Sequence, residues 1–273
     1  MLLHTVIEAI DPASSGYRLG RVQRLGAHLA VEMLAKSRVV AFSKVISDSL
    51  KQEYGHPPDL VFPIPCNDDV PVSPSQVAPR IVVIPGYISP YKNISLLPEL
   101  KEAVGAAARF IVVGGPHRVL EGSAAYRARF ESIQSALRSA GIEQSGYLPE
   151  AEFTELIRTA TVGLLPYLTT QGGSAAFSRL ASAGKPVVAP SLPEFNWLKQ
   201  LGAGLLLTDP SPDSLGAGVL QLLNNPDLYK ELQSKQLKFR TRYSWSNFTT
   251  ELFSVCRTNS GGATPIPSER LRC

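Results

Sequence analysis

The feature that most constrains this chain is a regular alternation, from residue 80 onward, of short β-branched apolar runs with amphipathic segments. The runs show no polar alternation, which is typical of strands buried on both faces. The segments between them carry apolar residues at helical spacing. Strands that alternate with helices favour a parallel sheet, and right-handed crossovers then give a doubly wound α/β domain.

The pattern predicts two kinds of element and two irregular segments. We expect strands at 2–7, 38–42, 60–64, 81–85, 110–113, 142–147, 162–165, 187–189 and 204–207. We expect helices at 18–36, 44–54, 94–104, 124–140, 150–160, 175–183, 194–201, 213–223, 227–242 and 245–256. Residues 67–79, rich in Pro, Ser and Asp, are predicted to be a linker, and the polar tail 258–273 to be disordered.

The best-defined stretch is residues 171–190, which reads as loop, helix, turn and strand. Gly172 and Gly173 form the loop, and Ser174 can cap the helix that follows. Gly184 suits the left-handed position that ends a helix, and Pro186 prevents its continuation. A glycine loop at a helix N-terminus can bind an anion through free N–H groups. The alternative is a tight turn whose glycines only allow the bend, and both interpretations stay open.

Composition excludes several classes of protein. The chain is 44% hydrophobic and 18% charged, which is typical of soluble globular domains, and no run approaches the ~20 apolar residues of a membrane span. The start lacks the basic and apolar parts of a secretory signal. The three cysteines, Cys66, Cys256 and Cys273, show no metal-ligand spacing, so we expect no metal and a reducing, cytoplasmic location. The net charge of +4 fits an acidic ligand, but dispersed basic residues argue against nucleic acid.

Parallel sheets of this kind bind ligands beyond the carboxyl ends of their strands. Three glycine-containing loops fall there, at 86–93, 114–117 and 169–174. The first loop does not match the dinucleotide fingerprint Gly-x-Gly-x-x-Gly, because Gly86 is followed by Tyr-Ile-Ser-Pro-Tyr. The chain also has no Walker loop and no Gly-x-Ser-x-Gly nucleophile turn. A dehydrogenase is therefore disfavoured.

Several motifs together resemble the retaining glycosyltransferases of family four. Residues 86–93, Gly-Tyr-Ile-Ser-Pro-Tyr-Lys-Asn, resemble their Gly-x-x-x-x-x-Lys-Gly loop, and residues 110–115 resemble their Leu-x-x-x-Gly strand end. Residues 146–149 resemble their Gly-Tyr-Val-Pro segment. Residues 181–188, Ala-Ser-Ala-Gly-Lys-Pro-Val-Val, are similar to their Ala-x-Gly-x-Pro-Val-Val signature. The likeness extends over about residues 36–256, and the order of the motifs is what makes it specific.

The resemblance implies the GT-B fold, in which two Rossmann-like domains face a cleft. Residues 80–242 would be the complete donor-binding domain, residues 1–66 a partial N-terminal acceptor-side domain, and residues 243–257 the closing helix. The implied ligand is a nucleotide-sugar donor, used as a substrate with no resident cofactor. The acceptor, a glycan, a lipid or a small molecule, is not implied by any motif.

The resemblance also implies residue roles. Lys92 would pair with the donor diphosphate, backbone N–H groups of the glycine loop would cradle it, and two residues would line the base pocket. His4 and Gln171 would lie at the reacting sugar as catalytic residues. For Lys92 the alternative is a solvated surface lysine, and for His4 a polar strand end. The implied donor-binding residues are Gly86, Ser89, Lys92, Tyr147, Leu148, Gly172, Gly173, Ser174 and Arg179.

The chain departs from the family in four places. Gln171 and Arg179 stand where relatives carry glutamates, and Ser89 stands where they often carry arginine. Arg179 has only donors, so it would meet a phosphate or turn outward into solvent. The N-terminal part is too short for a Rossmann-like half, which indicates either a clipped fragment or a partner chain that supplies the rest.

Three hypotheses follow from the likeness and the departures. The first is a glycosyltransferase, and the second is a degenerate, non-catalytic module that binds or regulates another protein. The third is a nucleotide-sugar epimerase of the same two-domain build. The basic helix at 227–242 leaves peripheral contact with the inner face of a membrane open, beside the simpler interpretation of a solvated basic surface.

Overall fold

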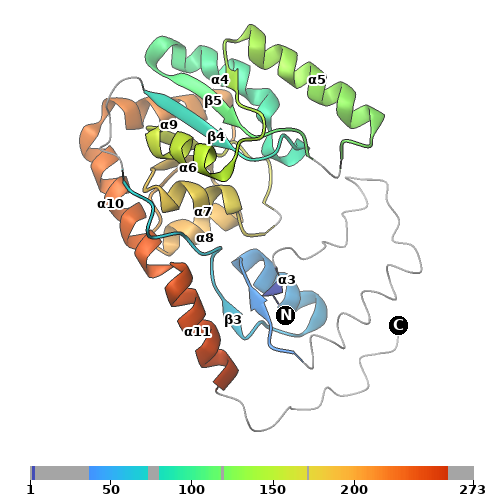
Figure 1. The fold of residues 1–273 in the computed structure, drawn as a ribbon, viewed down its shortest axis with the longest axis vertical. Coiled ribbons are helices and arrows are strands. Elements are labelled where there is room, and N and C mark those ends of the chain that lie inside the picture. Colours follow the sequence, from blue (N-terminus) through green and yellow to red (C-terminus); the bar gives the residue numbers. More distant parts are fainter. Residues whose placement is uncertain (1, 4–36, 73–79, 118–119, 171, 258–273) are drawn as a thin grey trace. The chain divides into compact units, whose positions relative to one another are not determined.

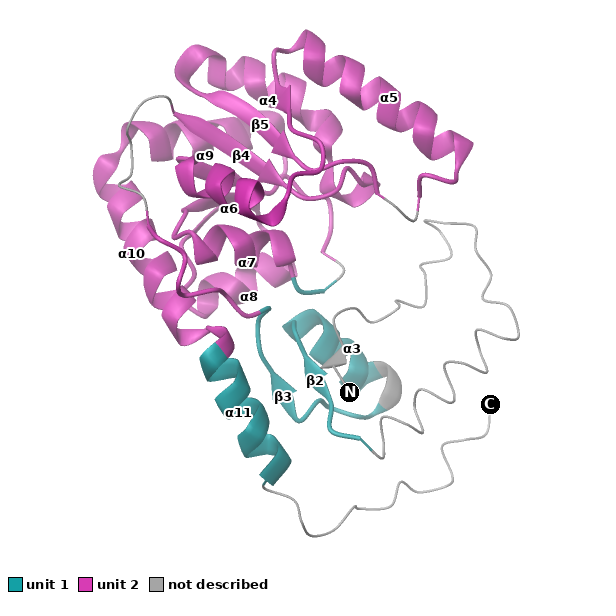
Figure 2. Ribbon diagram, viewed as in Figure 1, with its two compact units in different colours: residues 1–64, 171–173, 246–273 teal, residues 65–170, 174–245 magenta. Residues whose placement is uncertain are grey.

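The computed structural model describes residues 2–3, 37–72, 80–117, 120–170 and 172–257. The chain divides into two compact units (Figure 2). Unit 1 contains residues 1–64, 171–173 and 246–273, and unit 2 contains residues 65–170 and 174–245. The predicted domain boundaries at 66, 80 and 242 stay predictions. The predicted helix at 18–36 and the predicted disordered tail lie outside the described residues.

Unit 2 is built on a six-stranded parallel sheet with the order β6-β5-β4-β7-β8-β9. Its neighbouring strands β4 and β5 are labelled in Figure 1. The strands predicted in this unit are confirmed, and the one at 142–147 shrinks to two residues, as do those predicted at 38–42 and 60–64 in unit 1. The strand predicted at 142–147 ends early because Gly146 takes a left-handed conformation (φ +66°), which no extended strand accommodates. The strands are β4 (Ile81–Pro85), β5 (Arg109–Val113), β6 (Glu143–Gln144), β7 (Val162–Leu164), β8 (Val187–Pro190) and β9 (Leu205–Thr208).

Helices connect these strands and cover the sheet. α4 packs against α5 and α9, while α7 packs against α6 and α10. Right-handed crossovers in opposite directions from the centre of the sheet place α4 and α5 on one face and α7 and α8 on the other. The helices of unit 2 are α4 (Leu97–Val104), α5 (Ala124–Ser139), α6 (Glu150–Thr159), α7 (Ala175–Ser182), α8 (Pro193–Gln200), α9 (Pro212–Asn224) and α10 (Pro226–Arg242).

Three short 3-10 turns flank α4: η1 (Pro90–Lys92) and η2 (Ile94–Leu96) precede it, and η3 (Gly105–Ala107) follows it. Among these turns, η2 is the one that replaces the first part of a predicted helix. The helix predicted at 94–104 becomes α-helical only at Leu97, whose N–H still bonds the Ile94 carbonyl in 3-10 fashion. Pro98 follows and has no N–H with which to bond the same carbonyl at α-helical spacing.

The stretch after β7 folds as its sequence predicts. Ser174 accepts a hydrogen bond from the Phe177 N–H at 3.1 Å and so caps α7. Phe177, Leu180 and Ala181 are buried on one face of that helix. Gly184 then takes a left-handed conformation (φ +66°) and turns the chain into β8. Burial of this apolar face is what stabilises so short a helix.

The described residues of unit 1 form a small parallel sheet, β1-β2-β3, and the helices α3 and α11. Ser43 caps α3 by accepting from the Val45 N–H, and Gly55 ends it at a φ of +64°. Phe248 of α11 packs against Phe42 and Phe62, with ring centroids 5.4 and 5.3 Å away. The elements are β1 (Leu2–Leu3), β2 (Val40–Ala41), α3 (Lys44–Tyr54), β3 (Leu60–Val61) and α11 (Trp245–Arg257), whose first residue falls in unit 2.

Candidate functional site

The candidate site lies in unit 2 at the switch point of the parallel sheet, where the order in which strands are added reverses. β4 and β7 are neighbours, but the chain continues from β4 to β5 on one side and from β7 to β8 on the other. Loops that leave two such strands diverge and open a crevice at their carboxyl ends, the usual ligand position in this fold. Here the two loops are joined by a hydrogen bond from the Leu168 N–H to the Tyr91 carbonyl at 2.8 Å.

The loops after β4 and β5 also approach closely. The Gly86 N–H donates to the Val113 carbonyl at 2.8 Å, and the Ile88 N–H donates to the Gly115 carbonyl at 3.0 Å. Gly114 has a φ of +145°, and a Cβ there would lie 2.4 Å from the Gly86 carbonyl oxygen. Only glycine fits at such a contact, so the glycine after β5 is needed for the two loops to meet.

Lys92 ends the turn η1 and folds back over the start of its own loop. The residue is only 6% exposed, and a Cβ on Gly86 would lie 2.0 Å from its Nζ atom. Asn93 takes the left-handed conformation (φ 53°) where the family motif has glycine, a conformation that asparagine accepts more readily than most residues. The alternative of a solvated surface lysine is therefore wrong.

The charge on Lys92 is unusually placed. Burial lowers the pKa of its ammonium group from 10.5 to about 8. Within the described part of the chain no carboxylate lies within ion-pair distance of it, and no hydrogen bond from Nζ is found. A buried cation without an acid is costly, so the site favours a ligand that brings negative charge.

Two tyrosine rings stand next to this ammonium group. Nζ lies 5.9 Å from the ring centroid of Tyr91 and 5.7 Å from that of Tyr167. The rings meet edge to face, with centroids 5.5 Å apart. Burial raises the pKa of both phenols. We call Tyr91 and Tyr167 the tyrosine pair.

A second aromatic group lies at the ends of β4, β5 and β6. The Tyr87 ring meets the rings of His117 and Tyr147 edge to face, at 5.4 and 6.0 Å. Tyr87 and Tyr147 are 45% and 43% exposed. Tyr147 lies over Gly115, where an added Cβ would be 2.7 Å from its ring, and its hydroxyl donates to the Pro116 carbonyl. The result is an exposed aromatic surface on a rigid base.

The structure brings some predicted residues together and not others. Gly86, Ser89 and Lys92 share the β4 loop, and Ser89 is buried with no hydrogen-bond partner for its hydroxyl among the described residues. Tyr147 and the partly exposed Leu148 follow β6 in the same unit. His4 and Gln171 lie outside the described residues.

The two loop glycines belong to unit 1. Gly172 has a positive φ of +132°, as a glycine turn requires. A Cβ on Gly173 would lie 2.6 Å from the Phe42 carbonyl oxygen and 2.8 Å from Ile64. This packing gives Gly173 a structural reason for being glycine. Its predicted role and that of Gly172 in anion binding stay predictions.

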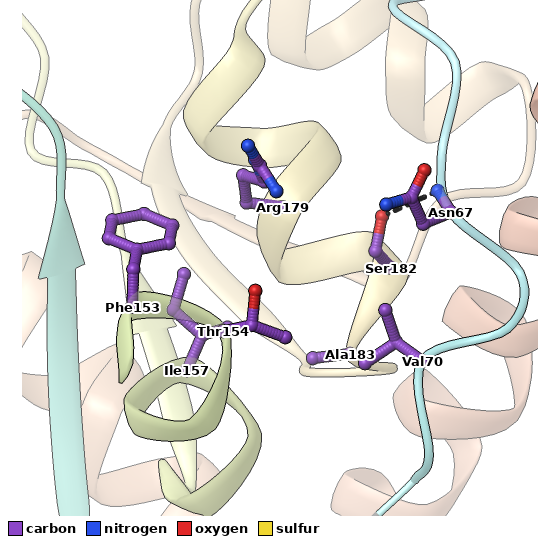
Figure 3. Close-up of a pocket in the computed structure, with 8 residues that line it drawn as sticks. All are labelled: Asn67, Val70, Phe153, Thr154, Ile157, Arg179, Ser182 and Ala183. Carbon is purple, nitrogen blue, oxygen red and sulfur yellow. Dashed lines mark hydrogen bonds between the residues drawn. The ribbon is translucent and has the colours of Figure 1, made fainter. Parts of the chain in front are cut away.

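Arg179 is paired with a carboxylate that the sequence did not single out. Its guanidinium forms a two-pronged ion pair with Glu150 at the start of α6, and it lies 5.7 Å from the Phe153 ring centroid. Arg179 also borders a small pocket between α6, α7 and the segment after Cys66 (Figure 3). The other lining residues are Asn67, Val70, Phe153, Thr154, Ile157, Ser182 and Ala183.

Sequence reasoning missed the tyrosine pair and Glu150. Tyr167 follows a predicted strand directly, so its place at a carboxyl end was a usable signal. Across the described ranges, no cluster of His, Cys, Asp and Glu suited to a metal is found. No helix among the described residues has both the length and the apolar character to span a bilayer.

The fold defines a class: a Rossmann-like α/β domain of the kind found in GT-B proteins. A family model described as "Glycosyl transferases group 1" matches residues 79–225, more than half of the chain. The chain therefore belongs to the group 1 glycosyl transferases. A comparison with curated protein sequences gives no match.

Solved structures agree on the fold. Sucrose-phosphate synthase from Thermosynechococcus elongatus is 15% identical to this chain, with a TM-score of 0.72. The match includes 94% of this chain and 66% of the synthase. Anabaena HepE, solved in complex with UDP, is 14% identical with a TM-score of 0.74, and the same share of this chain covers 71% of it. TarM from S. aureus is 16% identical with a TM-score of 0.68, and this chain covers 50% of it. The chain thus spans between 50% and 71% of the length of these proteins.

Proposed function

We propose that this chain is the donor-binding part of a glycosyltransferase that moves a sugar from a nucleoside diphosphate to an acceptor hydroxyl. The observation that carries the proposal is the Lys92 ammonium group, buried at the switch point of the sheet without an acidic partner among the described residues. A diphosphate would supply the missing charge. The unpartnered Ser89 hydroxyl in the same loop can add a hydrogen bond.

The chemistry requires charge stabilisation on the leaving group. The bond between the sugar C1 and the diphosphate oxygen breaks, and its electron pair leaves with the nucleoside diphosphate. The acceptor oxygen bonds to C1, and its proton passes to the departing diphosphate oxygen. A lysine fixed next to the departing phosphate stabilises the negative charge that develops there. The backbone N–H groups of Gly172, Gly173 and Ser174 are proposed to bind the same diphosphate, with His4 and Gln171 near the sugar.

The exposed aromatic surface supports a place for the base. Tyr87, His117 and Tyr147 present ring edges and faces at the ends of three neighbouring strands. Purine and pyrimidine bases stack well on such rings. Since HepE was solved in complex with UDP and also in complex with UDP-glucose, we take a uridine donor as the first to test.

A calorimetric titration of the chain with UDP, GDP and ADP tests the proposal, repeated with Lys92→Ala. We expect one nucleotide to bind in the micromolar range, and the substitution to weaken it at least ~10-fold, as loss of a charged phosphate contact does. If no nucleoside diphosphate binds to the folded chain, or if Lys92→Ala binds as well as the original, the proposal fails.

One observation favours the second candidate, a non-catalytic module. Arg179 stands where the family resemblance places a carboxylate, and it is engaged with Glu150. A chain of this kind would bind nucleotide weakly and turn nothing over. An assay of UDP-sugar hydrolysis, with the release of free sugar as its readout, distinguishes the transferase from the non-catalytic module. Any turnover that depends on Lys92 rejects the non-catalytic module.

A further inference from the structure

We propose that Tyr167, together with Tyr91, is a positioning residue that holds the Lys92 ammonium group ready for phosphate, in place of an acidic partner. This inference rests on the proposed function, because it names how that same site keeps its charge in place. The supporting geometry is the placement of Nζ 5.7 and 5.9 Å from the two ring centroids, within the range of a cation–π contact.

A ring and a carboxylate would act differently at this position. A carboxylate next to Lys92 would satisfy the ammonium group in the empty site, and it would then repel an arriving diphosphate. The faces of aromatic rings attract a cation without carrying a net charge. The tyrosine pair can therefore hold the ammonium group and still leave its charge available to an anionic ligand.

Tyr167 is fixed well enough to do this. It is 4% exposed, its N–H donates to the Leu165 carbonyl at 2.9 Å, and its ring packs against Phe195 with centroids 5.6 Å apart. Residues of the same unit thus hold both the backbone and the ring of Tyr167.

Tyr91 is fixed through its backbone. Its carbonyl accepts the 2.8 Å hydrogen bond from Leu168, so both members of the pair are tied to the segment that leaves β7. Gly86 closes the space from the third side, since any side chain there would occupy the position of Nζ. Lys92 is therefore confined by two rings and a glycine backbone.

The first experiment compares UDP with UMP in calorimetric titrations of Tyr167→Leu, Tyr167→Phe and Tyr91→Leu. The ring contact should be reflected in a loss of UDP affinity of about 3- to 30-fold in the leucine variants. Tyr167→Phe keeps the ring and should bind as the original does. UMP lacks the second phosphate, so its affinity should change far less. The ratio of UDP affinity to UMP affinity should therefore fall in the leucine variants.

Tyr229→Leu is the matched control. Tyr229 is equally buried, in α10, and its hydroxyl donates to the Thr161 carbonyl at 3.0 Å. It should lower stability as Tyr167→Leu does and leave the UDP to UMP ratio unchanged. An unchanged ratio in Tyr167→Leu, or an equal loss for both nucleotides, overturns the proposal.

A second experiment tests the contact between Lys92 and the tyrosine pair without a nucleotide. Acetic anhydride acylates free lysine amines, and mass spectrometry gives the rate at Lys92 relative to the exposed Lys199 in the same sample. We expect Lys92 to react several-fold faster in Tyr167→Leu, and at the original rate in Tyr167→Phe and Tyr229→Leu. An unchanged rate in Tyr167→Leu overturns the pair as a positioning device. Failure of UDP to bind the original chain rejects only the proposed function, since this rate still tests the pair.

Discussion

Two lysines of unit 2 are buried alike but lie at opposite ends of the sheet. Lys92 is 6% exposed and Lys185 is 1% exposed, and burial lowers the pKa of each from 10.5 to about 8. Lys92 follows β4, at the carboxyl edge. Lys185 precedes β8, at the amino edge, where repulsion from Arg158 contributes to the same lowering of its pKa, after burial.

The difference shows that a perturbed pKa alone does not mark a binding site. Perturbed groups cluster at functional sites, but structural positions perturb pKa values as well. What separates Lys92 from Lys185 is its position at the switch point, the tyrosine pair beside it and the glycine beneath it. We therefore expect the two lysines to differ in function and to resemble each other in their effect on stability.

The largest expected effect is on nucleotide binding. Lys92→Met should weaken the affinity for the nucleoside diphosphate by about 10- to 100-fold, because it removes a charged contact worth roughly 1.5–3 kcal/mol. Lys185→Met removes the same charge from the other end of the sheet and should leave affinity within about twofold. Calorimetry on both variants measures this directly. A comparable loss of nucleotide affinity in Lys92→Met and Lys185→Met would mean that the position of Lys92 in the sheet does not determine nucleotide binding.

Gly86→Ala should weaken binding almost as much, although it leaves Lys92 in the chain. The new methyl group would stand at the position of Nζ, and the φ of +112° is one that side chains rarely adopt. Gly141→Ala is the control, since Gly141 also has a positive φ, +66°, but has open space around it. Both should lower the unfolding free energy by about 1–2 kcal/mol, and only Gly86→Ala should reduce nucleotide affinity. Equal affinities would show that Lys92 moves aside without consequence.

Much of this contrast could be predicted from the sequence. The glycine loop and the order of strands and helices follow from local patterns, as do the caps at Ser43 and Ser174, whereas the role of Lys92 was implied by the family resemblance. Tyr167 could not be placed beside Lys92, because their meeting depends on β4 and β7 being neighbours in the sheet. The ion pair between Arg179 and Glu150 likewise joins residues far apart in the sequence. Local propensity carries no information on such pairings.

Lys92 and Lys185 should contribute similarly to the pH dependence of the unfolding free energy. Each binds its proton less tightly in the folded state (pKa about 8) than in the unfolded state (10.5), so between pH 8 and 10.5 the unfolded chain holds more protons. The unfolding free energy contributed by each lysine therefore rises with pH across that window. Below pH 8 the folded state bears the full cost of both buried charges.

Methionine at either position removes that cost. We expect Lys92→Met and Lys185→Met to be more stable than the original by about 1–3 kcal/mol at pH 7, with the advantage shrinking by pH 9.5. Urea unfolding at the two pH values measures it, and comparison with the original chain cancels other titrating groups. A variant that is less stable at pH 7 would show that the lysine has a stabilising partner.

The smallest expected effect concerns the solvent-exposed ion pair between Arg179 and Glu150. Arg179 and Glu150 keep side-chain exposures of 40% and 65%, so water screens their attraction. Glu150→Gln should change the unfolding free energy by less than ~1 kcal/mol, the usual range for an exposed ion pair. Nucleotide affinity should not change if the pair only joins α6 to α7. A loss of UDP affinity in Glu150→Gln would instead indicate that the Glu150 carboxylate accepts hydrogen bonds from the ribose hydroxyls of the donor. Arg179 cannot do so, because a guanidinium group has only donors. A solvated carboxylate would then take part in donor recognition together with the buried Lys92.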